Sequence, residues 1–200
     1  MSECQLAPAC QYALDEVTEC LQPDVEQATL LSASDWMGLL LVRFMAGRCR
    51  LPLAMGLAPE RFQSLCHLWG VTAEPDEASL GRQQLLAELL CSRQQERDDL
   101  AAWLQRYVVP EASEMAQIIA TASMGFNHLW EDLGLDSRAQ LRELMTVCFP
   151  EVVLMNSMNL RWKKFFYRQL CSAEGSYVCR APSCHVCYER AQCMAPEEVR

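Results

Sequence analysis

Lysine is almost absent from this chain: only two of its 17 basic residues are lysines, the adjacent Lys163 and Lys164. Long hydrophobic runs are also missing. The longest uninterrupted apolar stretch is residues 36–42, far short of the roughly 20 residues that a membrane-spanning helix needs. The sequence has no Gly-rich phosphate loop, no internal repeat and no sustained alternation of apolar and polar residues, the last of which would indicate strands. We therefore expect no membrane association and an all-α fold.

Positive charge is scarce overall but concentrated near the C-terminus. The formal net charge is −9, which argues against a general nucleic-acid binder. Residues 1–156 carry 10 arginines against 22 acidic residues, whereas residues 157–193 carry six basic residues against two acidic ones. A locally positive setting lowers the pKa of nearby thiols and favours anionic clusters or oxyanions. The C-terminal region is therefore the expected place for such a ligand.

Cysteine is too infrequent for a disulfide scaffold, since 12 cysteines in 200 residues fall below the roughly 8–10% that such scaffolds show. The chain opens with neither a basic n-region nor an apolar h-region, so we expect a cytoplasmic protein with reduced thiols. Four of its cysteines nonetheless lie within fifteen residues, in a C-x4-C-x2-C-x5-C pattern: Cys179, Cys184, Cys187 and Cys193. Thiolates this close repel one another, so the pattern predicts a bound metal centre.

The spacing of these four cysteines leaves two kinds of metal centre open. Structural zinc sites usually pair two short knuckles that are a dozen or more residues apart, and this segment has a single C-x2-C. The C-x4-C-x2-C part matches the front of a plant-type iron–sulfur spacing, although that pattern takes its fourth cysteine from far away. Backbone N–H groups of a short loop can donate to the bridging sulfides of a cluster. Spacing alone ranks an iron–sulfur centre slightly above zinc.

Three segments are expected along the chain. Residues 1–33 form an N-terminal segment, residues 34–171 a helical domain, and residues 172–200 a cysteine-rich segment packed on the same domain. Apolar residues recur every three or four positions through the middle segment. The predicted architecture is thus a helical bundle with an irregular C-terminal cysteine-rich metal-binding loop.

Capping and proline signals place the helix starts. Ser34 is expected to cap the first helix, Ser113 a central one and Ser137 the next, with Gln140 completing a capping box. Pro59 is expected to begin the second helix at its first turn.

Two long helices follow from the apolar pattern. A stripe from Met115 to Leu133 predicts one continuous helix before Gly134. Pro150 is expected to begin a final long helix that continues through Met158 into the C-terminal run.

Near the end of the central stripe, His128, Glu131 and Asp132 lie together. A histidine beside carboxylates can serve in acid–base or metal chemistry, but a structural hydrogen bond between helices is the favoured interpretation.

The last helix has two distinct sides. Its apolar side, predicted to face the core, consists of Trp162, Phe165, Phe166 and Leu170. A basic row, Arg161, Lys164 and Arg168, recurs at three- and four-residue spacing on another side and leads to Cys171. This row is suited to supporting an anion or docking an acidic partner, although such a row can also be a solvated helix face.

Specific sequence runs resemble a known family. The run RWKKFFYRQLC at residues 161–171, followed by CRAPSCHVCYERAQC at residues 179–193, resembles the signature of the NifQ family of molybdenum-processing proteins of nitrogen fixation. The resemblance includes MAQIIA, FNHLWEDLGL and CFP upstream and covers roughly residues 35–194. Leu160 stands where the family usually has methionine, and Met194 where an aromatic residue is usual. Neither position is a candidate ligand.

The resemblance implies a molybdenum–iron–sulfur cluster and a role in supplying molybdenum for the iron–molybdenum cofactor of nitrogenase. The metal ligands would be the four clustered thiols, with one additional candidate: Cys179, Cys184, Cys187 and Cys193, and then Cys171. The basic row, Arg161, Lys164 and Arg168, would steer molybdate, balance cluster charge or dock a partner.

The partners that the resemblance implies are the nitrogenase cofactor scaffold, the nitrogenase iron protein and a source of molybdenum, either molybdate or a storage protein. The protein is expected to be a metal donor more than a turnover enzyme. The alternative function is a zinc-stabilised interaction protein in which the four-cysteine loop is only structural. An iron–sulfur redox enzyme lacks support, because neither a nucleotide motif nor a catalytic triad is present.

Overall fold

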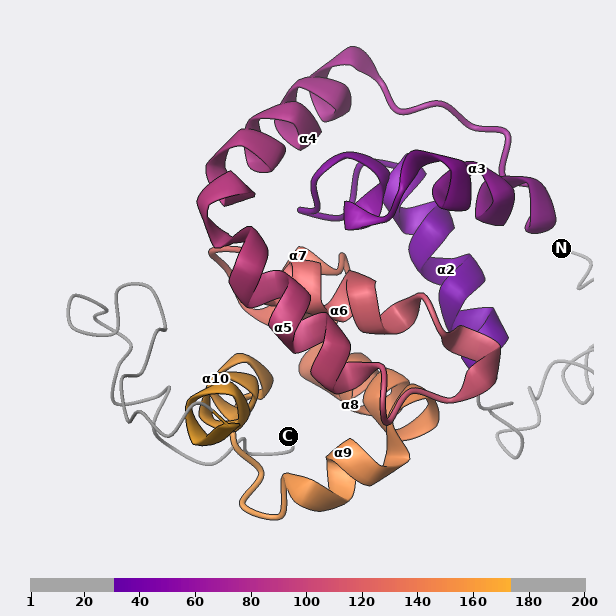
Figure 1. Ribbon diagram of the computed structural model, residues 1–200. Helices are drawn as coiled ribbons and strands as arrows, with labels where there is room; N and C mark the ends of the chain where they lie inside the picture. Colours follow the sequence, from indigo (N-terminus) through magenta and orange to yellow (C-terminus); the bar gives the residue numbers. More distant parts are fainter. Residues whose placement is uncertain (1–30, 174–200) are drawn as a thin grey trace, which may run out of the picture. The chain divides into compact units, whose positions relative to one another are not determined.

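The computed structural model describes residues 31–173, and these residues form helices and short turns without a strand. Figure 1 shows the helices in chain order. The α-helices are α2 (Ala33–Met45), α3 (Pro59–Leu68), α4 (Glu77–Leu90), α5 (Gln94–Leu104), α6 (Met115–Ser123), α7 (Leu129–Asp132), α8 (Arg138–Cys148), α9 (Pro150–Met155) and α10 (Trp162–Ala173). Three short 3-10 segments are η2 (Leu53–Gly56), η3 (Cys91–Arg93) and η4 (Pro110–Ala112). The all-α expectation is confirmed for this range, whereas the cysteine-rich loop at 179–193 lies outside the described residues.

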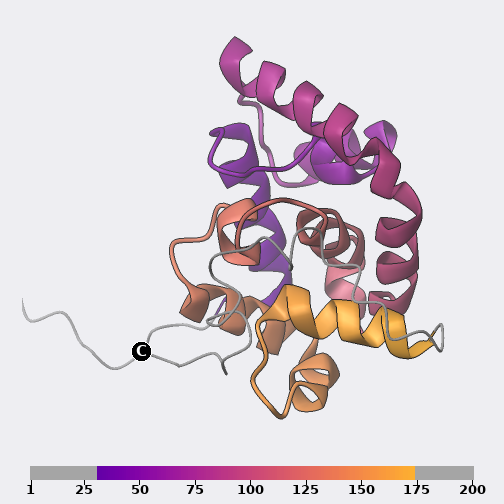
Figure 2. The same cartoon turned by 90° about the vertical axis from the view of Figure 1, so that its left-hand side faces the viewer.

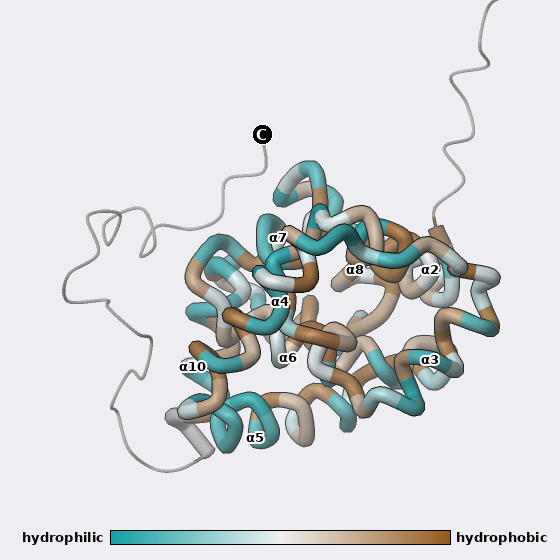
Figure 3. Tube along the Cα trace, turned by 90° about the horizontal axis from the view of Figure 1, so that it is seen from above, coloured by the Kyte–Doolittle hydropathy of each residue, from teal (hydrophilic) through white to brown (hydrophobic). Residues whose placement is uncertain are grey.

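Helix α6 lies at the centre of the described fold. Eight of its nine residues are buried, and only Gln117 is half-exposed. A helix that is apolar on all sides must be surrounded by other elements. Helix α5 packs along it, and α7 and η2 also contact it. Seen from above in Figure 3, α5 carries long hydrophilic stretches because its other side faces solvent.

Helix α10 packs on this core through aromatic side chains, as its sequence pattern predicts. Trp162, Phe165 and Phe166 are 5%, 3% and 0% exposed, and Leu170 is half-buried. Trp103 of α5 meets the rings of Phe165 and Phe166 edge-on, with centroids 6.2 and 6.4 Å apart. Edge-to-face pairs of this kind add about 0.5–1.5 kcal/mol beyond the area they bury. Figure 2 shows α10 lying along the side of the fold below α5.

Helix starts follow local signals with two exceptions. Pro59, Pro150 and Ser137 begin or cap their helices as expected, and the Ser137 hydroxyl accepts a hydrogen bond from Gln140 N at 3.2 Å. The expected capping box is wrong in its second half, because Gln140 Oε1 accepts from Asp136 N at 3.0 Å and not from Ser137 N.

The first exception is the cap of α2, which is Ser32 and not Ser34. The Ser32 hydroxyl accepts from Asp35 N, and the Asp35 carboxylate accepts from Ser32 N at 2.9 Å, a reciprocal capping box. Ser34 lies inside the first turn, where its side chain cannot serve as the cap.

The second exception is Ser113, which caps nothing. Helix α6 starts at Met115 after Glu114 and has no side-chain cap, because η4 leads directly into it.

The expected continuous helix from Met115 to Leu133 is wrong, since the chain breaks between α6 and α7. The Asp132 carboxylate accepts hydrogen bonds from Asn127 N at 3.3 Å and Asn127 Nδ2 at 2.9 Å. Side-chain bonds to the backbone compete in this way with helical hydrogen bonding. A Cβ at Gly125 would lie 2.5 Å from Asp132 Oδ2, so only glycine fits there.

The expected long helix from Pro150 into the C-terminal run is also wrong, because α9 ends at Met155. Asn156 closes the turn that follows: its Nδ2 donates to Leu160 O, and its Oδ1 accepts from Leu160 N, both at 2.8 Å. Asn159 has φ +48°, a left-handed conformation that asparagine tolerates better than most residues. The turn lets α10 change direction and pack on α5.

No helix within residues 31–173 is both long and apolar enough to cross a membrane.

Candidate metal centre and its support

The predicted ligands lie beyond the described part of the chain. The four clustered cysteines fall outside residues 31–173: Cys179, Cys184, Cys187 and Cys193. For Cys171, near the end of α10, the structure describes only the helical backbone. Within the described range, no three His, Cys, Asp or Glu side chains gather into a metal site. The structure therefore describes how α10, the element that leads into the cysteine segment, is held.

Three of the four cysteines whose side chains the structure describes are poorly suited to bind metal. Burial raises the pKa of Cys49 to about 12, although nearby Arg43 acts in the opposite direction, and burial raises that of Cys148 to about 12 as well. Burial also raises the pKa of the Cys66 thiol. The metal-binding form of cysteine is the thiolate, so these three side chains remain neutral thiols at neutral pH. Their environment is consistent with passive packing.

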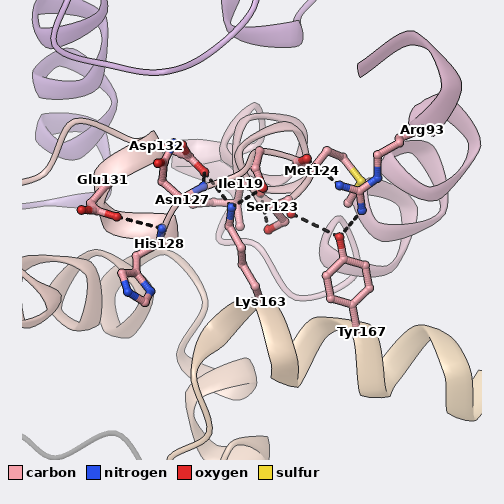
Figure 4. Close-up of polar contacts among 11 residues, drawn as sticks. Arg93, Ile119, Ser123, Met124, Asn127, His128, Glu131, Asp132, Lys163 and Tyr167 are labelled. Carbon is pink, nitrogen blue, oxygen red and sulfur yellow. Dashed lines mark hydrogen bonds and ion pairs between the residues drawn. The ribbon is translucent and has the colours of Figure 1, made fainter. Parts of the chain in front are cut away.

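The C-terminal end of α6 is the polar centre of this region (Figure 4). The last carbonyls of a helix lack partners within the helix, and they form the negative end of its dipole. Three consecutive carbonyls here each accept a hydrogen bond from a side chain that is distant in sequence. The pairs are Ser123 O with Tyr167 Oη (3.3 Å), Met124 O with Arg93 Nη1 (2.5 Å) and Gly125 O with Lys163 Nζ (2.9 Å). We call this set of contacts the α6 carbonyl junction.

A buried ion pair lies beside the junction. Lys163 Nζ is 2.6 Å from Asp132 Oδ2, and their side chains are 18% and 1% exposed. Burial lowers the pKa of the Lys163 ammonium, while the Asp132 carboxylate favours the charged form and opposes that change. The Asp132 carboxylate also accepts hydrogen bonds from the backbone N and from Nδ2 of Asn127. The pair ties α10 to the α6–α7 connection.

Arg93 completes the junction from η3. Its guanidinium forms an ion pair with Glu96 at 2.9 Å and donates to the Tyr167 hydroxyl. The same guanidinium lies 5.8 Å from the centre of the Tyr167 ring, within the range of a cation–π contact. Tyr167 in turn donates to Ser123 O, so a chain of contacts connects η3, α10 and the end of α6.

Two members of the group His128, Glu131 and Asp132 make structural contacts, and the contact of Asp132 with Lys163 joins two helices as the sequence favours. Glu131 Oε2 accepts from His128 N at 2.9 Å, which satisfies a free N–H at the start of α7. Asp132 is committed to Lys163 and Asn127. Figure 4 shows the two carboxylates engaged in these separate contacts.

The basic row does not lie entirely in the helix. Arg161 directly precedes α10, and its carbonyl accepts from Phe165 N at 2.9 Å. Lys164 is half-buried and Arg168 is exposed, both within α10. The role of the three residues toward an anion stays a prediction.

Sequence reasoning missed Lys163, Tyr167 and Arg93 as a structural unit. One signal was present: on a helical wheel Lys163 falls between Leu170 and Tyr167, inside the apolar side of α10. A lysine in that position needs a buried acceptor or anion. The acceptor, Asp132, lies 31 positions earlier, where no local pattern connects it to Lys163.

Comparison with known proteins gives the wider context. The family model described as NifQ matches residues 36–195, a range that includes the four clustered cysteines and α10. The chain belongs to the NifQ family. The family resemblance expected from the C-terminal run and the cysteine pattern is thereby confirmed.

Relatives match over most of the chain. Protein NifQ of Klebsiella pneumoniae is 50% identical over 161 residues, which cover 80% of this chain and 96% of the relative. Protein NifQ of Azotobacter vinelandii is 38% identical over 171 residues, or 81% of this chain and 88% of the relative. Protein NifQ of Rhodobacter capsulatus is 46% identical over 104 residues, or 52% and 58% of the two chains. No solved structure gives a significant match.

Proposed function

We propose that this chain carries a molybdenum–iron–sulfur cluster on its cysteine segment and donates molybdenum for the iron–molybdenum cofactor of nitrogenase. The observation that carries the proposal is the NifQ match, which continues through the whole four-cysteine pattern. Thiolates are the soft ligands that iron–sulfur clusters take. The proposed ligands are Cys179, Cys184, Cys187 and Cys193, with Cys171 as an additional candidate.

The described contacts support this assignment indirectly. Burial disfavours the thiolate forms of Cys49, Cys66 and Cys148, which makes them weaker candidates for metal ligands than the clustered cysteines. Helix α10 is anchored by its aromatic side and by the α6 carbonyl junction. The backbone that leads into the cysteine segment therefore starts from a fixed element.

The molybdenum is cargo in this proposal, and the protein is a donor more than a turnover enzyme. Molybdate or a molybdenum storage protein would supply the metal. The nitrogenase cofactor scaffold and the nitrogenase iron protein would be the partners in its transfer, in the cytoplasm.

Metal analysis of anaerobically purified protein tests the proposal. We expect a brown protein with a broad visible absorption that contains both iron and molybdenum. A colourless protein that contains zinc would overturn the proposal and establish the alternative, a zinc-stabilised interaction protein.

A change of Lys164 to glutamate tests the basic row. If Lys164 and its neighbours guide molybdate or balance cluster charge, Lys164→Glu lowers the molybdenum content more than the iron content. The effect weakens as salt rises, because exposed charges are screened over about 8 Å at physiological ionic strength. Both metals are measured by elemental analysis after reconstitution at several salt concentrations.

The matched control for this change is Arg50→Glu, which makes the same charge change at an exposed position outside α10 and is expected to load normally. Normal loading of Lys164→Glu with reduced molybdenum transfer would assign the row to acceptor docking. Normal loading and normal transfer would show that the row is only a solvated helix face.

A further inference from the structure

Three exposed apolar side chains lie within five consecutive residues at the end of α9 and in the turn that follows it. Leu154, Met155 and Met158 are 78%, 42% and 64% exposed. No other five consecutive residues of the described range carry as many exposed large apolar side chains. A group of this kind on a folded surface is typical of an interaction site. We call these three residues the α9 patch.

The α9 patch lies on an ordered turn. The side chain of Asn156 bonds both the N–H and the carbonyl of Leu160 at 2.8 Å, and Asn159 N donates to Asn156 O at 2.9 Å. Helix α8 holds the same turn, because Arg142 Nη1 donates to Asn159 Oδ1 at 3.3 Å. The backbone is therefore fixed on both sides of Met158. A partner that binds here does not have to order the turn, and ordering a loop is one of the main costs of association.

The part of the chain that contains the α9 patch is positively charged, whereas the rest of the described range is negatively charged. Residues 137–173 carry six basic residues against two acidic ones, and residues 31–136 carry eight against 14. One of the six, Lys163, is paired with Asp132, which leaves the sign of the difference unchanged. A positive surface on an otherwise acidic molecule favours an acidic partner.

Two arginines lie beside the α9 patch. Arg142 is exposed and contacts the turn itself, and Arg161 is half-buried three positions after Met158. Glu151, exposed one turn before the patch, is the only acidic residue of α9. Protein interfaces commonly have an apolar centre and a polar rim. The complementary surface is therefore apolar at its centre and carries carboxylates around it.

We propose that the α9 patch is the docking surface for the protein that accepts molybdenum from this chain, and that this acceptor presents an apolar contact surrounded by carboxylates. The inference rests on the function proposed above. A second copy of the chain fits the surface less well, because a two-fold contact pairs a surface with itself. Such a pair would bring two positively charged surfaces together, and like charges disfavour a complex.

The position of the α9 patch along the chain suits an acceptor. Figures 1 and 2 both show α9 and the turn after it at the lower edge of the described fold, and the turn leads directly into α10. The helical rise from Trp162 to Cys171 is about 14 Å. A standard interface of about 800 Å² per partner is roughly 30 Å across. One interface that includes the patch can therefore extend to the end of α10, from which the sequence continues toward the clustered cysteines.

Binding of the metal-loaded full chain to the purified nitrogenase cofactor scaffold tests the proposal. Leu154→Gln and Met158→Gln remove apolar contacts without changing the charge, and each should weaken binding about tenfold, as truncation of a central interface residue does. Both variants should hold as much iron and molybdenum as the wild type, while molybdenum transfer falls with binding. The control is Leu68→Gln, the same change at a position that is 75% exposed on α3, which should bind and transfer normally.

Charge changes test the acidic character of the acceptor. Arg142→Glu should weaken binding and Glu151→Gln should strengthen it, and both effects should shrink as salt rises, because exposed charges are screened. Arg50→Glu, at an exposed position outside α8–α10, should leave binding unchanged. Effects of the opposite sign at Arg142 and Glu151 would indicate a basic partner and overturn the proposal. Because Arg142 also contacts the turn, the melting temperature of each variant is measured, and Leu154→Gln tests the patch without removing that contact.

The outcomes separate this inference from the function on which it rests. If the wild type transfers molybdenum but both glutamine variants of the patch bind the scaffold as tightly as it does, the acceptor docks elsewhere and only the inference is wrong. A loaded wild type that does not bind the scaffold overturns the inference as well. A dimer of the chain that Leu154→Gln disrupts, with scaffold binding unchanged, would assign the patch to a second copy. A wild type without molybdenum would overturn the proposed function itself, and this inference with it.

Discussion

Replacing Cys184 or Cys187 by alanine is expected to remove the metal cluster outright, leaving protein with neither iron nor molybdenum. The two cysteines are separated by two residues, so both must bind together for the segment to close around a cluster. Loss of one thiolate removes a ligand, a negative charge and the geometry of the site at once. Elemental analysis and the visible spectrum of the anaerobically reconstituted variants measure the result.

A matched control for this experiment is Cys91→Ala. Cys91 is an exposed free cysteine in η3, so its removal changes the thiol count without touching the proposed ligands. This variant should retain full iron and molybdenum. If Cys184→Ala or Cys187→Ala also kept a full complement of both metals, the cluster would have to lie elsewhere in the chain.

Lys163→Met is expected to lower the free energy of unfolding by about 3–5 kcal/mol, because it leaves a buried carboxylate without its counter-charge. Asp132 is 1% exposed and would retain only the two donors of Asn127. The same change removes the donor to Gly125 O at the end of α6. Denaturant unfolding of the metal-free chain, followed by circular dichroism, gives the measurement.

The neighbouring lysine supplies the control. Lys164→Met removes the same charge one position along α10 without breaking the Asp132 contact, so we expect a smaller cost than for Lys163→Met. The double variant Lys163→Met with Asp132→Asn should cost less than the two single changes added together, since it removes both charges. Equal effects of Lys163→Met and Lys164→Met would contradict the structural role of the pair.

Features with a local physical cause could be predicted from the sequence. Proline at the first turn identified the starts of α3 and α9, and the Ser137 hydroxyl identified the cap of α8. The apolar side of α10 followed from helical spacing. The family followed from short runs whose residues are adjacent in the chain. In each case the residues that cause the feature lie within a few positions of one another.

Features that depend on distant residues could not be predicted. The break between α6 and α7 exists because Asp132 binds Asn127 and Lys163, and only folding brings Lys163 there. The left-handed turn η2, with Ala54 and Met55 at φ +54° and +56°, has no signal in its sequence except Gly56. The Thr121 side chain of α6 leaves no room for a Cβ at that glycine.

Helix α4 shows a third kind of limit. Its leucines recur at helical spacing, but they divide between two sides of the helix. Leu86 and Leu90 are half-buried on the side of Ser79 and Gln83, whereas Leu85 and Leu89 are exposed. Spacing predicts the helix but does not say which side the rest of the chain covers. The cysteine ligands are the opposite case, because their close spacing in the sequence by itself indicates a metal centre. Their assignment as ligands stays a prediction that the metal analyses above test.

The α6 carbonyl junction also makes α10 a natural fusion point for protein engineering. The buried side chains of α10 among the described residues lie between Trp162 and Tyr167, so the helix is secured by its first half. In a chimera that keeps residues 31–170 and replaces the C-terminal residues after them by another metal-binding peptide, that peptide would begin at the end of an anchored helix. Such chimeras would allow different metal centres to be compared on one unchanged helical platform.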